Sequence, residues 1–357
     1  MLRQLLAPLL VALSAGASSA GAAEGDFYAH KTITVVVGLN AGGTADLLAR
    51  QLAIHLRRHI PGEPAIIVQN MPGGSGVVAT NYAYERAKPD GMTILWGPWD
   101  PLSQLLGNQP IRARYERFAF LGATSDIRVN YARTDIVPGG LKRPADIVRA
   151  KEVLIGESSI TGFSGLLARL SLDVLGVPNR LVTGYGGGTE AFLALQRGEV
   201  SFHNVSLTAF RGRISPFIKS GGGMGINYFV PMDASGRFER DPSIPEMPAF
   251  PDLYADLNGK SPTGPVWDAL NWLTNQIGAM AFVALAPPGT PAPAVALLRT
   301  AYEAVAKDPD FVRESVAANG SPYGFIGVAR GEAILRALAT VSPEVRDTLR
   351  RLVEASP

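Results

Sequence analysis

The chain has 357 residues, of which 46% are hydrophobic, and its formal net charge is only +2. It contains no cysteine, so its fold uses neither disulfides nor thiolate metal ligands. The basic residues are scattered along the sequence rather than grouped, which argues against a nucleic-acid-binding surface. The length exceeds that of one ordinary hydrophobic core, so we expect two lobes.

Residues 1–23 have the features of a secretory signal peptide. Arg3 supplies the positive charge, Leu5 to Leu13 form a short apolar segment, and residues 20–22 are small enough for cleavage. The apolar segment is too short to span a membrane. We expect cleavage after residue 22 or 23 and a mature protein in a bacterial periplasm, with a secreted eukaryotic protein as the alternative. No cysteine follows, so we expect no lipid anchor.

Strands and helices alternate over residues 33–96, a pattern typical of an α/β lobe with a doubly wound sheet. The first strand is a run of β-branched residues, as in strands buried on both faces of a parallel sheet. Leu48, Leu52 and Leu56 share one face of the helix that follows. The predicted elements are strands at 33–37, 65–68 and 92–96, and helices at 45–59 and 77–87.

The same alternation returns after about residue 132. The predicted strands are 153–155, 181–183, 200–203 and 224–229, and the helices are one starting near 144 and others at 164–175, 189–197 and 211–220. Residues 231–265 are rich in proline, glycine and charge without periodicity, which predicts an irregular surface segment. The chain then continues with a helix at 267–277, a strand at 280–285, a proline-rich turn at 287–291, a helix to residue 305 and further helices.

The segment after residue 280 adds a strand and helices without an obvious third core. We therefore expect it to complete the first lobe. The predicted domains are lobe 1 at 24–130 and 229–357, and lobe 2 at 131–228. The chain then crosses between the lobes near 128–133 and again near 225–229, which predicts a hinge and a ligand-binding cleft between the lobes.

Three glycine-rich junctions follow predicted strands and begin predicted helices. Backbone N–H groups at a helix N-terminus lack intrahelical partners and attract anions. Strand carboxyl ends are also where ligands of open α/β sheets bind. The three junctions therefore predict capture of a small carboxylate by main-chain groups. The candidate ligand-binding residues are Gly42, Gly43, Thr44, Ala45, Asp46, Ser158, Ser159, Thr161, Gly162, Ser164, Tyr185, Gly186, Gly187, Gly188 and Thr189.

Each of these residues also has an ordinary structural interpretation. A glycine-rich turn is more often a tight connection than a ligand site, and serine or threonine at a helix start is often a cap. Asp46 either stabilises the helix dipole or accepts a hydrogen bond from ligand. Tyr185, Trp96 and Trp99 either form walls of the cleft or pack in the core.

Known catalytic patterns are missing from the sequence. Gly162-Phe163-Ser164 does not continue as a nucleophile elbow, and no phosphate-binding or dinucleotide-binding loop is complete. His55 and His59 have the spacing of a metal-binding pair, but no glutamate follows His55 as a zinc protease requires. We interpret them as part of a solvated helix surface. We therefore expect a protein that is not an enzyme and that has neither cofactor nor metal.

Four stretches together resemble the Bug, or tricarboxylate-binding receptor, family of periplasmic solute receptors that serve tripartite tricarboxylate transporters. Ile33 to Arg50 resembles the family's first strand, glycine loop and helix. Ile67 to Gly76, followed by Lys88-Pro89-Asp90-Gly91, resembles its "ENRPGAGG…APDGYT" pair. Residues 182–200 resemble its "PYKG…LLGGQV" segment, and 284–291 resemble its "APPGTP" turn. The four stretches occur in the family's order over most of the mature chain.

The resemblance implies a type II periplasmic-binding fold, in which two lobes, each with a mainly parallel sheet flanked by helices, close on ligand. It also implies main-chain contacts from Gly42 to Asp46, and second-lobe contacts from Ser158 to Ser164 and from Tyr185 to Thr189. The family's usual hydroxyl residue before the aspartate is replaced by Ala45, and its usual lysine by Gly186.

The sequence therefore predicts a receptor that captures a small organic carboxylate and delivers it to the membrane subunits of a transporter. We expect a monomer without nucleic-acid partners. Two alternatives remain. One is a secreted α/β hydrolase that uses Ser158 or Ser164, and the other is a related protein that serves as a sensor rather than in transport.

Overall fold

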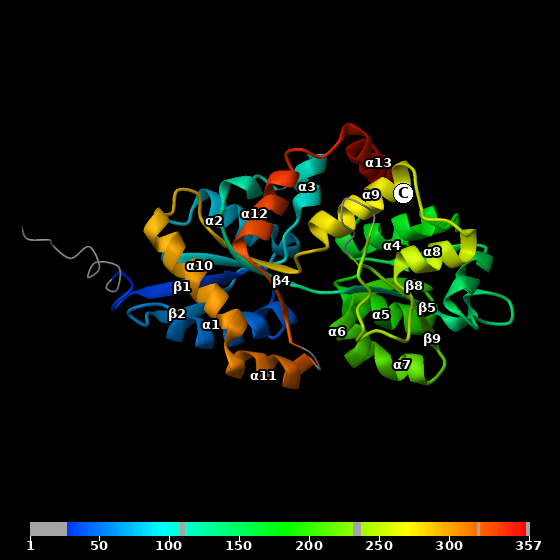
Figure 1. The fold of residues 1–357 in the computed structure, drawn as a ribbon, viewed down its shortest axis with the longest axis horizontal. Helices are drawn as coiled ribbons and strands as arrows, with labels where there is room; N and C mark the ends of the chain where they lie inside the picture. Colours follow the sequence, from blue (N-terminus) through cyan, green and yellow to red (C-terminus); the bar gives the residue numbers. More distant parts are fainter. Residues whose placement is uncertain (1–26, 108–110, 231–236, 320–321, 355–357) are drawn as a thin grey trace, which may run out of the picture.

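The computed structural model describes residues 27–107, 111–230, 237–319 and 322–354. The predicted signal peptide lies outside these residues. The described chain forms two α/β lobes side by side, each built around its own sheet (Figure 1). The prediction of a two-lobed α/β fold is confirmed.

The first lobe has a six-stranded sheet in the order β11-β4-β10-β3-β1-β2. β1 is parallel to β2 and β3, whereas β10 is antiparallel to both β3 and β4. The sheet is therefore mixed, not mainly parallel, because the returning chain adds strands that run in the opposite direction. Its strands are β1 (Thr32–Val37), β2 (Ala65–Asn70), β3 (Thr93–Gly97), β4 (Ala119–Ser125), β10 (Phe282–Ala286) and β11 (Gly324–Ile326).

The second lobe has a five-stranded sheet in the order β7-β6-β8-β5-β9. β6 is parallel to β7 and β8, and β5 is antiparallel to β8 and β9, so this sheet is mixed as well. Its strands are β5 (Arg128–Arg133), β6 (Val153–Gly156), β7 (Asn179–Val182), β8 (Phe202–Ser206) and β9 (Gly223–Tyr228).

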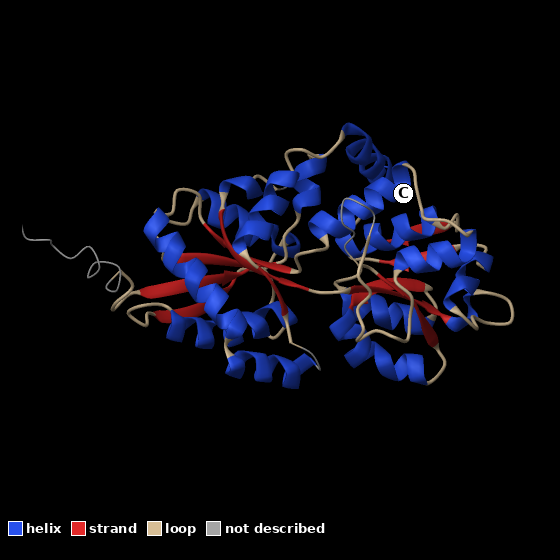
Figure 2. Cartoon of the chain, viewed as in Figure 1, coloured by secondary structure: helices blue, strands red, loops and turns tan. Residues whose placement is uncertain are grey.

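Helices cover both sheets (Figure 2). The helices that come before β5 or after β10 in the chain are α1 (Thr44–His59), α2 (Val77–Glu85), α3 (Pro101–Leu106), α10 (Ala292–Lys307), α11 (Pro309–Asn319), α12 (Val328–Ala337) and α13 (Pro343–Glu354). The others are α4 (Phe163–Val174), α5 (Gly188–Arg197), α6 (Leu207–Ala209), α7 (Ser215–Lys219), α8 (Phe250–Asn258) and α9 (Pro265–Trp272). Two π-helical turns, η5 (Phe210–Ile214) and η6 (Leu273–Ile277), continue α6 and α9.

The structure differs from the sequence prediction mainly between residues 101 and 133 and between 231 and 265. α3, β4 and most of β5 had not been predicted as regular elements. Within 231–265, the described residues include helix α8, which buries Phe250 and Leu253. The prediction of an irregular segment is wrong there, because Phe250, Leu253 and Leu257 recur at helical spacing although prolines surround them.

The sheets locate the two crossings of the chain. β4 of the first sheet ends at Ser125 and β5 of the second begins at Arg128, so Asp126 and Ile127 form the first connection. The second follows β9, after Tyr228. α8 packs against the second lobe near β9, although its residues come after this crossing. The predicted domain boundaries at 130 and 228 stay a prediction.

Four hydrophobic clusters form the core, and one of them spans both lobes. The cluster between α1, α10 and the first sheet contains Leu48 and Leu298. The spanning cluster joins first-lobe residues to Leu166 and Leu170 of α4 and to Leu349 of α13. The Arg169 Nη1 also donates a hydrogen bond to the Leu352 carbonyl, 2.7 Å away. Helices α9 and α13 therefore tie the lobes together along one side.

The face of α1 that carries His55 and His59 is not simply solvated. His55 is 1% exposed, and its ring nitrogens contact Asp308 at 3.3 Å and Glu314 at 3.0 Å. His59 contacts the same Asp308 at 3.0 Å. The prediction of a solvated surface is therefore wrong for His55, which Asp308 and the α11 residue Glu314 cover. The side chain of His59 remains 30% exposed.

None of the helices in the described ranges is both long enough and apolar enough to cross a bilayer.

Replacing Gly331 by alanine is expected to destabilise the first lobe by about 1–3 kcal/mol. Gly331 lies in α12, where a Cβ would overlap the ring of the buried Phe120. This overlap outweighs the higher helix propensity of alanine. The matched control is Gly212→Ala in η5, where a Cβ meets no atom within 4 Å. Urea unfolding measures both variants, and a G331A protein as stable as wild type would contradict the packing described here.

Candidate functional site

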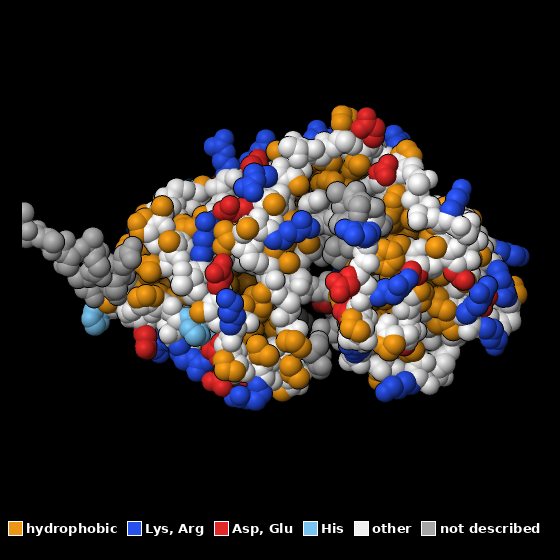
Figure 3. All heavy atoms as spheres, in the orientation of Figure 1, with side chains coloured by type: hydrophobic (Ala, Val, Ile, Leu, Met, Phe, Trp, Pro, Cys, Tyr) orange, Lys and Arg blue, Asp and Glu red, His pale blue; other side chains and the backbone are white. Residues whose placement is uncertain are grey.

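A cavity of about 380 Å³ lies between the two lobes. Figure 3 shows a hollow between the lobes near the centre of the face in view. The first lobe contributes residues that follow β3 and residues at the start of β10, and the second contributes residues of β8, α4 and η5. A ligand here would contact both lobes at once.

The two walls of this interlobe cavity differ in chemistry. The first-lobe wall is apolar and consists of Pro98, Trp99, Ile277, Gly278, Met280, Ala281 and Phe282. The second-lobe wall is mostly polar and consists of Arg128, Glu157, Phe163, Ser164, Gly188, His203, Asn204, Val205, Ser206, Ala209 and Arg213. Asp126 lies at the connection between them. The cavity thus combines charged groups that fix orientation with apolar surface that gives affinity.

Arg128 is held rigidly at the start of β5. Its Nε donates to the Asn204 side-chain oxygen at 2.9 Å, and its Nη2 donates to the Ser164 hydroxyl at 2.5 Å and to the Asn204 carbonyl at 3.2 Å. The guanidinium also lies over the ring of Phe163, 5.9 Å from its centre. Burial lowers the pKa of Arg128, while Asp126 and Glu157 raise it.

A chain of hydrogen-bonded asparagine side chains holds Arg128 in position. Asn204 donates to the Asn130 oxygen at 2.9 Å, and Asn130 donates to Asn227 at 3.1 Å and to the Ser171 hydroxyl at 2.9 Å. All three asparagines are at most 1% exposed. Buried polar groups that satisfy one another define one geometry, because any displacement leaves a buried group without a partner.

Two further titratable groups of the cavity have displaced pKa values. Burial raises the pKa of Asp126 to about 6, although Arg128 acts in the opposite direction. Burial lowers the pKa of His203 to about 3, and the positive charges of Arg128 and Arg213 add to this effect. His203 is therefore neutral near pH 7, and its Nδ1 lies 3.2 Å from the Tyr131 hydroxyl.

In the first glycine loop, residues 42–46, the loop's own aspartate occupies a backbone N–H group. Asp46 is 2% exposed and accepts the Gly42 N–H at 2.8 Å, and it also contacts Arg50 and Asn70. These hydrogen bonds, that from Arg50 above all, lower the pKa of Asp46. Its carboxylate is thus occupied within the protein. The loop emerges beside the cavity residues Pro98 and Trp99, because Val37 pairs with Trp96 in the sheet.

The second glycine loop is closed in the same way by Glu157. This carboxylate accepts the Ser158 N–H at 2.6 Å, the Ser158 hydroxyl at 2.9 Å and the Gly165 N–H at 2.6 Å. Glycine is required at 162 and 165, since a Cβ at either position would lie within 3 Å of the Glu157 side chain. A protein carboxylate therefore lies at the N-terminus of α4.

The third glycine loop is closed by Glu190 and presents an arginine. Glu190 accepts the Gly186 N–H at 2.7 Å. Thr189 accepts a hydrogen bond from Arg213 Nη1, and a Cβ on Gly188 would lie 3.9 Å from Arg213 Nη2. Tyr185 packs against the apolar cluster of the second lobe instead of lining the cavity.

The structure thus brings two of the candidate residues, Ser164 and Gly188, into the lining of the interlobe cavity. Thr189 reaches the cavity through Arg213. The others are not among its lining residues: Gly42, Gly43, Ala45, Asp46, Ser158, Ser159, Thr161, Gly162, Tyr185, Gly186 and Gly187; the side chain of Thr44 lies outside what the structure describes. Their role in binding stays a prediction.

Trp96 and Trp99 take different roles. Trp96 is buried in the core, where its indole N–H donates to the Ala45 carbonyl at 3.0 Å and so fixes the start of α1. Trp99 lines the cavity, and its N–H donates to the Met280 carbonyl at 3.1 Å. Trp96 therefore packs in the core, whereas Trp99, which is 7% exposed, both packs in the core and lines the cavity.

Sequence reasoning did not find the charged and polar side chains of the cavity. Asp126, Arg128, His203, Asn204 and Arg213 come from three separate segments. A signal was present in β8, where His203 and Asn204 stand between the apolar residues Phe202 and Val205. Polar residues on a buried strand need buried partners, which indicates either a hydrogen-bond network or a site.

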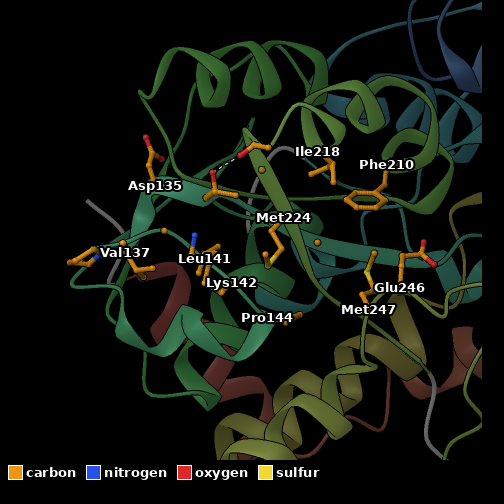
Figure 4. A pocket seen from close by; sticks show the side chains of 17 residues that line it. Asp135, Val137, Leu141, Lys142, Pro144, Phe210, Ile218, Met224, Glu246 and Met247 are labelled. Carbon is orange, nitrogen blue, oxygen red and sulfur yellow. Dashed lines mark hydrogen bonds between the residues drawn. The ribbon is translucent and has the colours of Figure 1, made fainter.

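A larger cavity of about 970 Å³ lies elsewhere, on the outer side of β9 in the second lobe. Figure 4 shows Phe210, Ile218 and Met224 along it, with Asp135 and Glu246 at its margins. All its lining residues come from the second lobe and the segment packed against it. Occupation of this cavity would not bridge the lobes, so we place the candidate site in the interlobe cavity.

Among the described residues, no group of three or more histidine, cysteine, aspartate or glutamate side chains is arranged to hold a metal ion.

No protein-family model matches the chain. A UPF0065 protein of Bordetella pertussis is 26% identical over 315 residues, which cover 85% of this chain and 84% of that protein. Protein BugT of the same organism is 36% identical over 81 residues, 23% of this chain and 24% of BugT.

Solved structures share the fold over nearly the whole described chain. The periplasmic binding protein BugD has a TM-score of 0.61 at 22% identity, covering 91% of this chain and 98% of BugD. MatC from Rhodopseudomonas palustris, solved with bound malate, has a TM-score of 0.58 at 23% identity, covering 90% and 99%. Another R. palustris protein, solved with adipate, has a TM-score of 0.62 at 19% identity, covering 92% and 98%.

Replacing Asp126 by asparagine is expected to stabilise the protein at pH 8 but not at pH 4. The pKa of about 6 in the folded protein lies above the value of about 3.9 in an unfolded chain. The folded state therefore holds the proton more tightly, and this stabilisation is full below about pH 4 and lost as the pH rises through 6. Asparagine does not ionise, so the variant keeps the stability that the wild-type protein loses at pH 8, which is on the order of 1–3 kcal/mol.

Urea unfolding at about pH 4, 6 and 8 measures the difference. Asp135→Asn is the matched control, because a hydrogen bond from Arg133 lowers rather than raises the pKa of Asp135. The control should not gain stability at pH 8. Equal free energies of unfolding for wild type and D126N at that pH would contradict the assignment.

Proposed function

We propose, since this chain is a homologue of the UPF0065, or Bug, proteins, that it is an extracytoplasmic solute-binding protein for a small organic carboxylate. It captures this ligand between its lobes and delivers it to the membrane subunits of a tripartite tricarboxylate-type transporter. We further propose that it acts as a monomer in the periplasm, without a lipid anchor. The observation that carries the proposal is a cavity that both lobes line and whose second-lobe wall holds two arginines.

Arginine is suited to a carboxylate ligand, because its planar guanidinium donates two parallel hydrogen bonds to the two oxygens. The related proteins solved with malate and adipate bind ligands of this chemical class. A ligand that contacts both walls stabilises the closed arrangement of the lobes by its higher affinity for that state. The transporter can then distinguish loaded from empty protein by its shape.

The hydrolase alternative has less support. The Ser164 hydroxyl accepts a hydrogen bond from Arg128, and the Ser158 hydroxyl donates to Glu157. Within the part of the chain described here, neither serine forms a hydrogen bond to a histidine that would activate it. A non-transport sensor would use the same binding cavity, so the test of transport is whether uptake of the ligand requires this protein.

Addition of the correct carboxylate is expected to stabilise the protein without turnover. A ligand at one hundred times its dissociation constant adds about 2.7 kcal/mol to the free energy of unfolding. A thermal-shift screen of mono-, di- and tricarboxylates, followed by calorimetry, measures the effect, and chromatography of the recovered ligand tests for turnover. Chemical conversion of the ligand, or no stabilisation by any carboxylate, would contradict the proposal.

Replacing Gly43 by valine is expected to weaken ligand binding at least tenfold and leave the fold intact. Gly43 precedes α1 in an extended conformation, and a Cβ there lies 3.4 Å from its nearest neighbour, the Asn40 carbonyl. The added methyl groups would crowd the N–H groups at the start of α1, beside those of Gly42 and Gly43 that Asp46 and Asn40 already accept. Gly327→Val is the matched control, since Gly327 precedes α12 in a similar conformation and lies outside the three glycine loops. Unchanged affinity in calorimetry would show that the first loop does not bind ligand.

A further inference from the structure

We infer that the ligand carries a single carboxylate on an apolar body, with its carboxylate bound by Arg213 and its body against Trp99 and Phe282. This inference rests on the proposed function of the cavity and specifies which carboxylates it accepts. It assigns Arg213 as the residue that orients the ligand.

Arg213 is available for a ligand in a way that neighbouring arginines are not. In the described ranges it forms no ion pair with a carboxylate, and its Nη1 donates a hydrogen bond to the Thr189 hydroxyl. Arg211, two residues earlier, instead contacts the Ser243 carbonyl and lies 3.8 Å from Glu246. Arg213 also lines an adjoining cavity of about 240 Å³ that shares Asp126 and Phe282 with the first.

The π-helical turn η5 explains why Arg213 faces the cleft. A π turn inserts an extra residue into a helix and changes the direction of the side chains on either side, and such turns are frequent at functional sites. Phe210, at the start of η5, lines the outer cavity beside β9, whereas Arg213 lines the interlobe cavity. The turn thus places Arg213 on the second-lobe wall of the interlobe cavity, opposite the first lobe.

Arg128 contributes positive charge, but its guanidinium does not offer the ligand a second pair of parallel hydrogen bonds. Its Nε and Nη2 already donate to Asn204 and Ser164. It therefore adds positive potential beside Arg213 while remaining fixed in place. The low pKa of His203, to which burial and both arginines contribute, agrees with a positive potential at this wall.

The remaining surfaces disfavour a second carboxylate on the ligand. Asp126 lines both the interlobe cavity and its extension, and Glu157 lines the interlobe cavity. A second carboxylate near either one would meet a like charge. Placed against the opposite wall, it would lose its water of hydration without gaining a cation.

The first-lobe wall suits an apolar body instead. The Trp99 N–H is already bonded to the Met280 carbonyl, so its ring presents only apolar surface. Met280, Ala281 and Phe282 continue this surface along the start of β10. A ring or alkyl chain placed there gains free energy in proportion to the apolar area it removes from water.

The test compares hexanoate with adipate, which have the same six-carbon chain and differ by one carboxylate. Calorimetry on the full mature chain should show that hexanoate binds at least tenfold more tightly than adipate, and that benzoate also binds. Malate and citrate complete the panel as ligands with two and three carboxylates. Tighter binding of adipate, malate or citrate than of hexanoate would overturn the inference and leave the receptor function standing.

The variant Arg213→Gln should lower the affinity for hexanoate at least tenfold, because it removes a charge-assisted pair of hydrogen bonds. Arg213→Lys should recover part of the loss, since lysine keeps the charge but not the fork. Arg211→Gln is the matched control on the same turn and should bind as wild type does. If R213Q binds hexanoate unchanged, Arg213 is not the anchor. If wild type binds no member of the panel or of a wider carboxylate screen, the proposed function itself fails.

Discussion

The candidate site depends on one buried polar chain that fixes Arg128 where the polypeptide passes from the first sheet to the second. Its guanidinium is bound by Asn204, which is bound by Asn130, which is bound by Asn227. The links between the asparagines are buried, which fixes the position of Asn204 and, through it, that of the part-buried Arg128 before any ligand arrives. The cation therefore belongs to the second lobe as a fixed feature, and its field acts on His203, Asp126 and any anion in the cleft.

Much of the fold could be predicted from the sequence, because most strands are short apolar runs bounded by glycine or proline. β1, β2, β3 and β6 lie within two residues of their predicted positions. β4 and most of β5 were missed, since Gly122 interrupts the apolar pattern of β4 and Arg128 and Asn130 interrupt that of β5. The antiparallel direction of β10 depends on where the returning chain enters the sheet, and no local pattern carries that information.

The site was harder to predict, for two physical reasons. Arg128, His203 and Arg213 are distant in sequence, and only tertiary structure brings them together. The glycine loops were read as open anion sites, yet each has its own carboxylate on the loop N–H groups. Asp46 and Glu190 each stand four residues after the glycine whose N–H they accept, so the sequence did contain the signal that these loops are partly closed.

The cluster that joins α4, α9 and α13 limits how the lobes can separate. Opening on that side would expose Leu170, Leu273 and Leu349, which are completely buried, at a cost of roughly 25 cal/mol for each Å² of apolar surface. The lobes can therefore separate only along the edge opposite α9 and α13. A solute in the interlobe cavity must enter and leave through that edge.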